Sequence, residues 1–147
     1  MNMLDRLRIS LKRNEAIRTN RVAVGKMKLV YVLVADKRLR YANGRSRIAY
    51  IGTTRKGAER IAQSVAARAE AIFKLRGVRS FDARIVTCNP RQNVETWKKL
   101  ERGLLLCFRE RFDEVPKCNS KGKRMRPRDE FDLFAKKRLM NVINELS

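Results

Sequence analysis

Histidine is absent from this 147-residue sequence, and its absence excludes many enzymes. Without an imidazole, Ser-His-Asp and Cys-His nucleophiles are impossible, and so is any nuclease that uses histidine as its general base. A phosphate-binding loop of the form G-x-x-x-x-G-K is also missing, which excludes ATP hydrolysis by that route. Any chemistry must therefore use Tyr, Arg, Lys, Glu, Asp or Asn.

Cysteine and long apolar runs are scarce as well. The three cysteines, Cys88, Cys107 and Cys118, cannot all pair with one another and form no C-x-x-C unit. We therefore expect free thiols in a reducing, cytoplasmic setting. No signal peptide is visible, and the apolar runs are far shorter than the roughly 20 residues that a membrane span needs.

Positive charge is what the sequence has in abundance. Lys and Arg number 36 against 15 Asp and Glu, a net charge of +21 at pH 7. Such an excess opposes compaction, so it favours a polyanionic partner over a merely solvated basic surface. Because the basic residues run through the whole chain, nucleic acid is favoured over a membrane surface.

Three strands are expected from stretches rich in β-branched and aromatic residues, at positions 28–34, 48–52 and 81–87. Asn43-Gly44 is a hairpin signal between the first two, because both residues tolerate positive φ. The segment between these strands is long and basic, so we expect the hairpin to extend beyond the sheet.

Helices are expected where apolar residues recur at helical spacing, at positions 2–20, 57–75, 94–112 and from about 129. Together the elements predict an α+β fold, a small three-stranded, mainly antiparallel sheet flanked by helices. A ββαβα core at 27–123 would lie between a basic amphipathic helix within 1–26 and a C-terminal helix within 124–147.

Glu101 is the most informative single residue. It lies within the apolar stripe of the second long helix, four residues after Trp97 and four before Leu105. A carboxylate that faces a core costs several kcal/mol unless it is paired or binds a cation. The pattern leaves two alternatives open, a structural salt bridge and a divalent metal site.

Two tripeptides resemble the motifs that name the GIY-YIG nucleases: Val30-Tyr31-Val32 and Tyr50-Ile51-Gly52. Arg60 follows Tyr50 by ten residues, as the family's catalytic arginine does. Glu101 lies in a Leu-Glu-x-x-Leu-Leu helix that is similar to the family's metal-binding segment. Pro116 to Asn119, followed by Lys121-Gly122-Lys123, is similar to its closing segment. The resemblance covers about residues 28–123.

The resemblance implies a metal-dependent DNA endonuclease that hydrolyses phosphodiesters with a single Mg²⁺ or Mn²⁺ ion. Glu101 would hold the ion, and Arg60 would contact phosphate oxygens. Tyr31 or Tyr50 would orient or deprotonate the attacking water, and the sequence does not rank them. Asn119 would hydrogen-bond a phosphate or a tyrosine. The Tyr50 hydroxyl, the Arg60 guanidinium and the Glu101 carboxylate would then converge on one open, cation-rich cleft.

Each of the two tyrosines, Arg60 and Asn119 also has an ordinary structural interpretation. Tyr31 and Tyr50 could simply pack in strands, Arg60 could be a solvated surface residue, and Asn119 could cap its own turn.

The sequence departs from the family at two positions. Leu29 stands where glycine is usual, and Ser64 stands where the family often has His or Tyr. Serine cannot replace an imidazole as a base, so Lys56 or a tyrosine would have to take over proton transfer.

Basic residues on two loops would hold the DNA backbone. They are found on the hairpin, just after its second strand, and in the loop after Asn119: Arg38, Arg40, Arg45, Arg47, Arg55, Lys56, Lys121, Lys123, Arg124 and Arg126. We expect double-stranded DNA in preference to RNA.

One alternative is a DNA- or RNA-binding protein that has the nuclease fold without cutting. Another is a protein that acts through partners or dimerises through its terminal helices.

Overall fold

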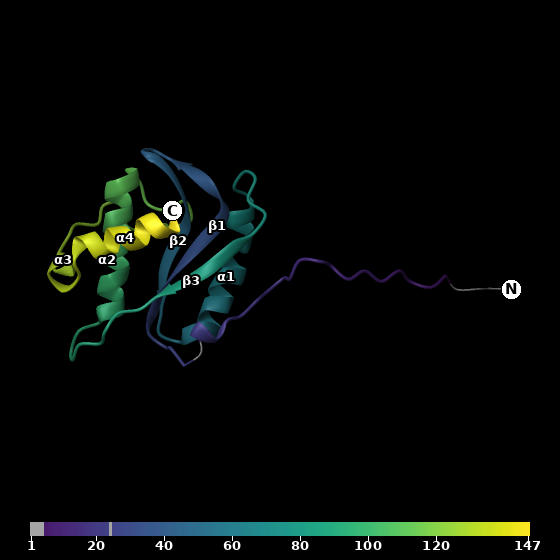
Figure 1. Cartoon of the computed structure of the whole chain (residues 1–147), viewed down its shortest axis with the longest axis horizontal. Coiled ribbons are helices and arrows are strands. Elements are labelled where there is room, and N and C mark those ends of the chain that lie inside the picture. The colour runs from purple at the N-terminus through teal and green to yellow at the C-terminus, as the bar shows by residue number, and fades with distance from the viewer. Residues whose placement is uncertain (1–4, 24) are drawn as a thin grey trace.

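Three antiparallel strands form a sheet at the centre of the protein, with helices on both of its faces (Figure 1). The computed structural model describes residues 5–23 and 25–147. The elements in chain order are η1 (Arg21–Ala23), β1 (Leu29–Tyr41), β2 (Gly44–Thr54), α1 (Gly57–Phe73), β3 (Phe81–Val86), α2 (Thr96–Phe112), α3 (Glu130–Leu133) and α4 (Lys136–Leu146). The predicted α+β class and ββαβα order are confirmed.

β1 is the central strand, because the strand order is β2-β1-β3. Its first half is fully enclosed, with Leu29, Val30, Val32 and Leu33 all at 0% exposure. Buried on both faces, this strand needs a continuous apolar run, and Leu29–Val34 provides one. Pairing with β3 involves only residues 30–35, so Leu29 and residues 39–41 pair with β2 alone.

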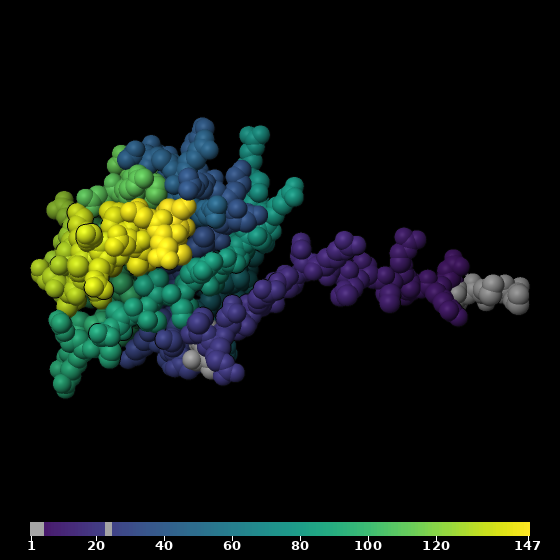
Figure 2. All heavy atoms as spheres, viewed as in Figure 1, coloured from purple at the N-terminus to yellow at the C-terminus, as the bar shows by residue number. Residues whose placement is uncertain are grey.

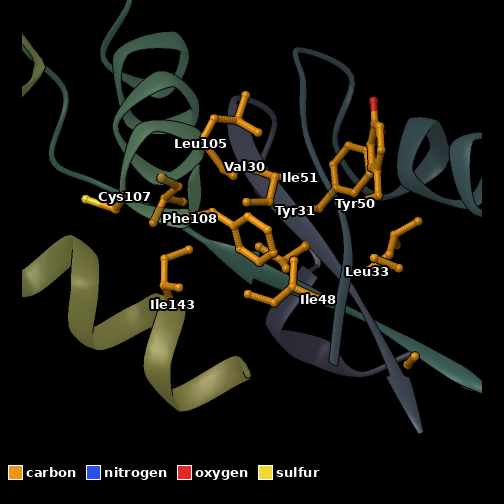
Figure 3. Close-up of a cluster of buried hydrophobic side chains, with 14 of the residues drawn as sticks. Val30, Tyr31, Leu33, Ile48, Tyr50, Ile51, Leu105, Cys107, Phe108 and Ile143 are labelled. Atoms are coloured by element: carbon orange, nitrogen blue, oxygen red, sulfur yellow. The ribbon is translucent and has the colours of Figure 1, made fainter. Parts of the chain in front are cut away.

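The helices divide between the two faces of the sheet. α2 and α4 cover one face, where Leu105, Phe108 and Ile143 belong to the same buried cluster as Ile51 of β2, while α1 covers the opposite face beside Tyr31 and Tyr50 (Figure 3). Within the described residues, no helix is both long and apolar enough to cross a membrane. All three cysteines are free thiols.

The hairpin lies where Asn43-Gly44 predicts it. Tyr41 pairs with Gly44, so the loop itself is Ala42-Asn43, and Gly44 takes the positive φ of 107°. Both strands extend well beyond β3, as expected from the long segment between the two tyrosine motifs.

The helix predicted at residues 2–20 is wrong over the described part of that range, 5–20, which contains no helix. Met3 and Leu4, two residues expected on its apolar face, lie outside the described residues. Leu7 and Leu11 are 93% and 95% exposed, and the segment extends away from the folded body (Figure 2). A short helix is marginal in water unless its apolar face is buried, and this one has no surface to pack against.

The single C-terminal helix predicted from about residue 129 is also wrong, because it is broken into α3 and α4. Phe134 between them is extended, with φ −126° and ψ 132°. Tertiary packing explains the break. Glu130 is fully buried in an ion pair with Arg102 of α2, whereas α4 turns to bury Leu139 and Ile143.

Candidate functional site

The two motif tyrosines lie side by side on the α1 face of the sheet. Tyr31 of β1 and Tyr50 of β2 have ring centroids 5.9 Å apart, with their hydroxyl ends directed the same way (Figure 3). Gly52 makes this arrangement possible, because a Cβ there would stand 2.6 Å from the Tyr50 ring and 2.9 Å from the Tyr31 hydroxyl. Both tyrosine side chains therefore pack directly over the glycine of the Y-I-G tripeptide.

Each tyrosine hydroxyl has a partner on α1. The Tyr31 hydroxyl and Ser64 Oγ are 2.6 Å apart, and Arg68 Nη2 donates to the Tyr50 hydroxyl at 2.6 Å. The Arg68 guanidinium also lies 3.9 Å from the centre of the Tyr50 ring. Ser64, expected to be of little use as a base, instead positions Tyr31.

Arg68 is a site residue that the sequence analysis missed. The signal was its spacing, since Arg60, Ser64 and Arg68 are four residues apart and share one stripe of α1. Nothing in the sequence alone shows that this stripe faces the tyrosines.

Burial raises the pKa of Tyr31 above its ordinary value of 10, although Ser64 and Arg68 oppose the rise. The Tyr31 hydroxyl stays protonated at neutral pH, so it can orient a ligand but is a poor base.

Arg60 and Lys56 lie at the exposed beginning of α1. Arg60 Nη1 donates to Gln63 Oε1 at 3.1 Å, and Lys56 is exposed just before the helix. Arg60 is one turn before Ser64, so its side chain continues the stripe outward from the tyrosine pair. The Tyr50 hydroxyl accepts a hydrogen bond from Arg68, whereas Arg60 hydrogen-bonds Gln63.

Glu101 lies on α2, half-buried and next to Thr53 of β2. Burial raises the pKa of its carboxyl above the ordinary value, with Lys121 and the Thr53 hydroxyl opposing the rise. Of the nine ion pairs found in the described part of the chain, none includes Glu101. The salt-bridge alternative is therefore not realised there.

The sheet separates Glu101 from the tyrosine hydroxyls. Directly paired residues share a face, so Tyr31 and Gly52 face α1, whereas Val30 and Thr53 face α2. The predicted convergence of Tyr50, Arg60 and Glu101 on one cleft is not confirmed. The two groups are nevertheless adjacent along β2, since Thr53 directly follows Gly52.

A metal ion at this site would depend on Glu101. The residues with assigned structure contain no cluster of three or more His, Cys, Asp or Glu side chains. A lone carboxylate that is partly withdrawn from water and not ion-paired fits one hard cation, if water and phosphate oxygens supply the remaining ligands.

Asn119 has a structural role that differs from the one expected. It is 8% exposed, its Oδ1 accepts from the Ile51 amide at 3.0 Å, and its Nδ2 donates to the Ile51 carbonyl at 2.9 Å. The Cys118 amide also donates to the Ala49 carbonyl. Both ends of the Asn119 amide are thus occupied in fixing the loop to the edge of β2, not in holding a phosphate or a tyrosine.

The expected DNA-binding residues fall into two exposed groups. The hairpin residues Arg38, Arg40, Arg45 and Arg47 and the loop residues Lys121, Lys123, Arg124 and Arg126 are all exposed. Arg55 differs, because it pairs with Glu95 at 3.2 Å and its charge is partly offset.

Two arginines of α2 that the sequence analysis did not single out order the basic loop. Arg109 donates to the carbonyls of Gly122 and Met125, and Arg102 donates to that of Arg126.

No family model, curated protein or solved structure matches this chain.

Proposed function

We propose that this protein is a metal-dependent endonuclease that hydrolyses DNA phosphodiester bonds in the manner of the GIY-YIG nucleases. The observation that carries the proposal is Glu101. It is the carboxylate that combines partial burial and a raised pKa with no ion pair within the described structure. The fully buried Glu130 is paired with Arg102, whereas Glu101 has no such pair within the described residues, so a bound cation would compensate its burial.

The tyrosine pair supports the same proposal. Tyr31 is buried, and its protonated hydroxyl is hydrogen-bonded to Ser64; this hydroxyl would hold a water or a phosphate oxygen as a second partner. Arg68 places a positive charge beside Tyr50, and its buried Nε has no acceptor within the described structure. A phosphate oxygen or a water would satisfy this donor. Arg60 adds an exposed fork of donors one turn away on the same stripe.

Glu101 would hold one Mg²⁺ or Mn²⁺ ion, which when bound supplies positive charge to the phosphate and to the leaving oxygen. The net charge of +21 favours a polyanion, and we place duplex DNA ahead of RNA. The free thiols are in keeping with action in a reducing, cytoplasmic compartment.

The test is cleavage of supercoiled plasmid by the purified protein with Mg²⁺ or Mn²⁺, with an EDTA control. Glu101→Gln should reduce nicking by about 100-fold or more, because the metal ligand is lost. Glu59→Gln, which removes an exposed carboxylate of α1, should cut like the wild type. Wild-type cutting by Glu101→Gln would refute the assigned site.

A second candidate is a DNA- or RNA-binding protein that does not cut. The position of Glu101 across the sheet from the tyrosines favours it. This alternative predicts tight, salt-sensitive binding without cleavage in either metal ion.

A further inference from the structure

Beyond the reach of β3, the hairpin continues as residues 36–41 of β1 and 44–47 of β2, here called the arginine ribbon. Residues 39–41 pair with 44–46, whereas a register shift between Val34 and Leu39 leaves residues 36–38 without partners on β2. Its inner face is fixed to the helices. Leu39, Tyr41 and Ser46 are buried, Tyr41 stacks edge-on against Phe108 of α2, and Ser46 hydrogen-bonds Ser147 at 2.8 Å.

The outer face of the ribbon is composed of arginines. Arg40 and Arg45 are directly paired across the two strands, and both are exposed, as are Arg38 and Arg47. No ion pair engages these four side chains within the described residues. Like charges directly opposite each other destabilise a sheet, so this pairing has a cost that folding alone does not explain.

The arginine face lies on the same side of the sheet as the tyrosine pair. Ile48 pairs with Val34 on the α2 face, and a register shift at Ala49 separates it from Tyr50 on the α1 face. Continuing the alternation from Ile48, Ser46 points inward and both Arg45 and Arg47 point outward. The exposed arginines of the ribbon therefore lie on the side of the sheet that also carries Tyr31 and Tyr50.

The tip of the ribbon is held in place by the end of α2. The Asn43 amide donates to the Phe112 carbonyl at 3.0 Å, and Asn43 Nδ2 donates to the Arg111 carbonyl at 3.1 Å. The Ala42 amide donates to the Glu114 carboxylate. A ribbon fixed in this way loses little conformational entropy when it binds a partner.

We propose that the arginine ribbon lies in the major groove of duplex DNA. This proposal rests on the proposed function only for the identity of its ligand. The major groove of B-form DNA admits a two-stranded ribbon, and arginine is the side chain best suited to guanine O6 and N7 and to phosphate oxygens. The major groove of duplex RNA is deep and narrow, so RNA duplexes should be poor ligands.

The test is binding of the full chain to a labelled DNA duplex in EDTA, measured by fluorescence anisotropy. Arg40→Gln with Arg45→Gln should weaken binding by at least about tenfold. The control, Lys137→Gln with Arg138→Gln, removes the same charge from exposed positions on α4 and should change binding less than about threefold.

Dimethyl sulfate footprinting identifies the groove, because it methylates guanine N7 in the major groove and adenine N3 in the minor groove. We expect the wild type to protect guanine N7, and the ribbon variant to lose that protection even at saturating concentration. Protection of adenine N3 instead, unchanged binding by the ribbon variant, or equally tight binding of duplex RNA would each overturn the proposal.

These measurements need no cleavage, so the two proposals can fail separately. Protection of guanine N7 without plasmid nicking would refute the proposed nuclease activity and support the DNA-binding role of the arginine ribbon. Nicking without N7 protection would support the nuclease activity and refute the role of the ribbon.

Discussion

Two glutamates of this chain are withdrawn from water, and their surroundings differ. Glu130 receives a hydrogen bond from Arg102 and another from the Arg128 amide. Burial tends to raise its pKa, but these partners lower it overall. Glu101 keeps some exposure to solvent, whereas Glu130 has none, yet the pKa of Glu101 is raised because no comparable partner offsets its burial. At the residue scale, one carboxylate is a structural element and the other is available to a ligand.

Glu130→Gln should destabilise the protein by about 3 kcal/mol at pH 7, because it leaves the buried side of Arg102 unpaired. The folded-state pKa of Glu130 is depressed, so its contribution is present above the unfolded-state value and is lost as pH falls through the folded-state value. Urea unfolding between pH 7 and pH 3 should show the variant converging on the wild type. Equal stability at pH 7 would contradict this.

Glu101→Gln should have the opposite effect, with stability at pH 7 no lower than that of the wild type. Since the folded-state pKa of Glu101 is raised, its favourable contribution exists at low pH and is lost as pH rises through the folded-state value. Thermal unfolding of Glu101→Gln and Glu130→Gln at pH 7 forms a matched comparison. A large loss in Glu101→Gln would show that this carboxylate is structural.

Asn119→Ala should destabilise the protein by about 2 kcal/mol, because the amide and carbonyl of Ile51 lose their side-chain partners. Asn141→Ala, at an exposed position on α4, is the control and should be nearly neutral. Urea midpoints would decide, and a neutral Asn119→Ala would mean that the loop is held to β2 by other contacts.

At the scale of elements, β2 contributes residues to the tyrosine pair, to the surroundings of Glu101 and to the arginine ribbon. Its register shift at Ala49 brings Tyr50 to the α1 face, Gly52 then seats both tyrosines, and Thr53 meets Glu101 on the far face. The same strand provides Arg45 and Arg47 of the ribbon. A change that distorts β2 should therefore affect binding and chemistry together.

Gly52→Ala should lower stability by about 2 kcal/mol and reduce cleavage, since the new methyl group would overlap both tyrosine rings. Gly103→Ala is the comparison, because its methyl group would come close only to the end of the flexible Leu139 side chain, would lie at ordinary contact distance from Glu130, and alanine favours the helix. Thermal unfolding and plasmid nicking test both variants. A harmless Gly52→Ala would mean that the tyrosine pair can shift freely.

At the scale of the whole molecule, the fold is a body with an extended basic arm. Deleting residues 5–20 should leave the melting temperature within about 2 °C of the wild type, since exposed side chains contribute little. A loss of several degrees would show that the arm packs against the body in solution.

Salt dependence reports on the charge of the whole molecule. If about six phosphates are neutralised, the logarithm of the affinity for duplex DNA should fall with the logarithm of salt concentration at a slope near five. The double variant of Arg40 and Arg45 should lower that slope by up to about two. A nearly flat dependence would contradict DNA binding by the basic surface.

The sequence by itself determined the fold class, the ββαβα order of the core and the extension of the hairpin beyond the sheet. These depend on local periodicity and turn chemistry, which are written in neighbouring residues. It also identified Tyr31, Tyr50 and Glu101 as unusual, because the two tyrosines lie in motifs and Glu101 interrupts the apolar stripe of its helix.

Only the tertiary structure decided which of these residues meet. Arg68 on Tyr50, Ser64 on Tyr31 and Asn119 on Ile51 are contacts between segments distant in sequence. The fate of the terminal helices was decided in the same way, because an amphipathic segment forms a helix only where the folded body offers a surface. Residues 5–20 have no such surface beside them and form no helix, whereas α4 packs against α2.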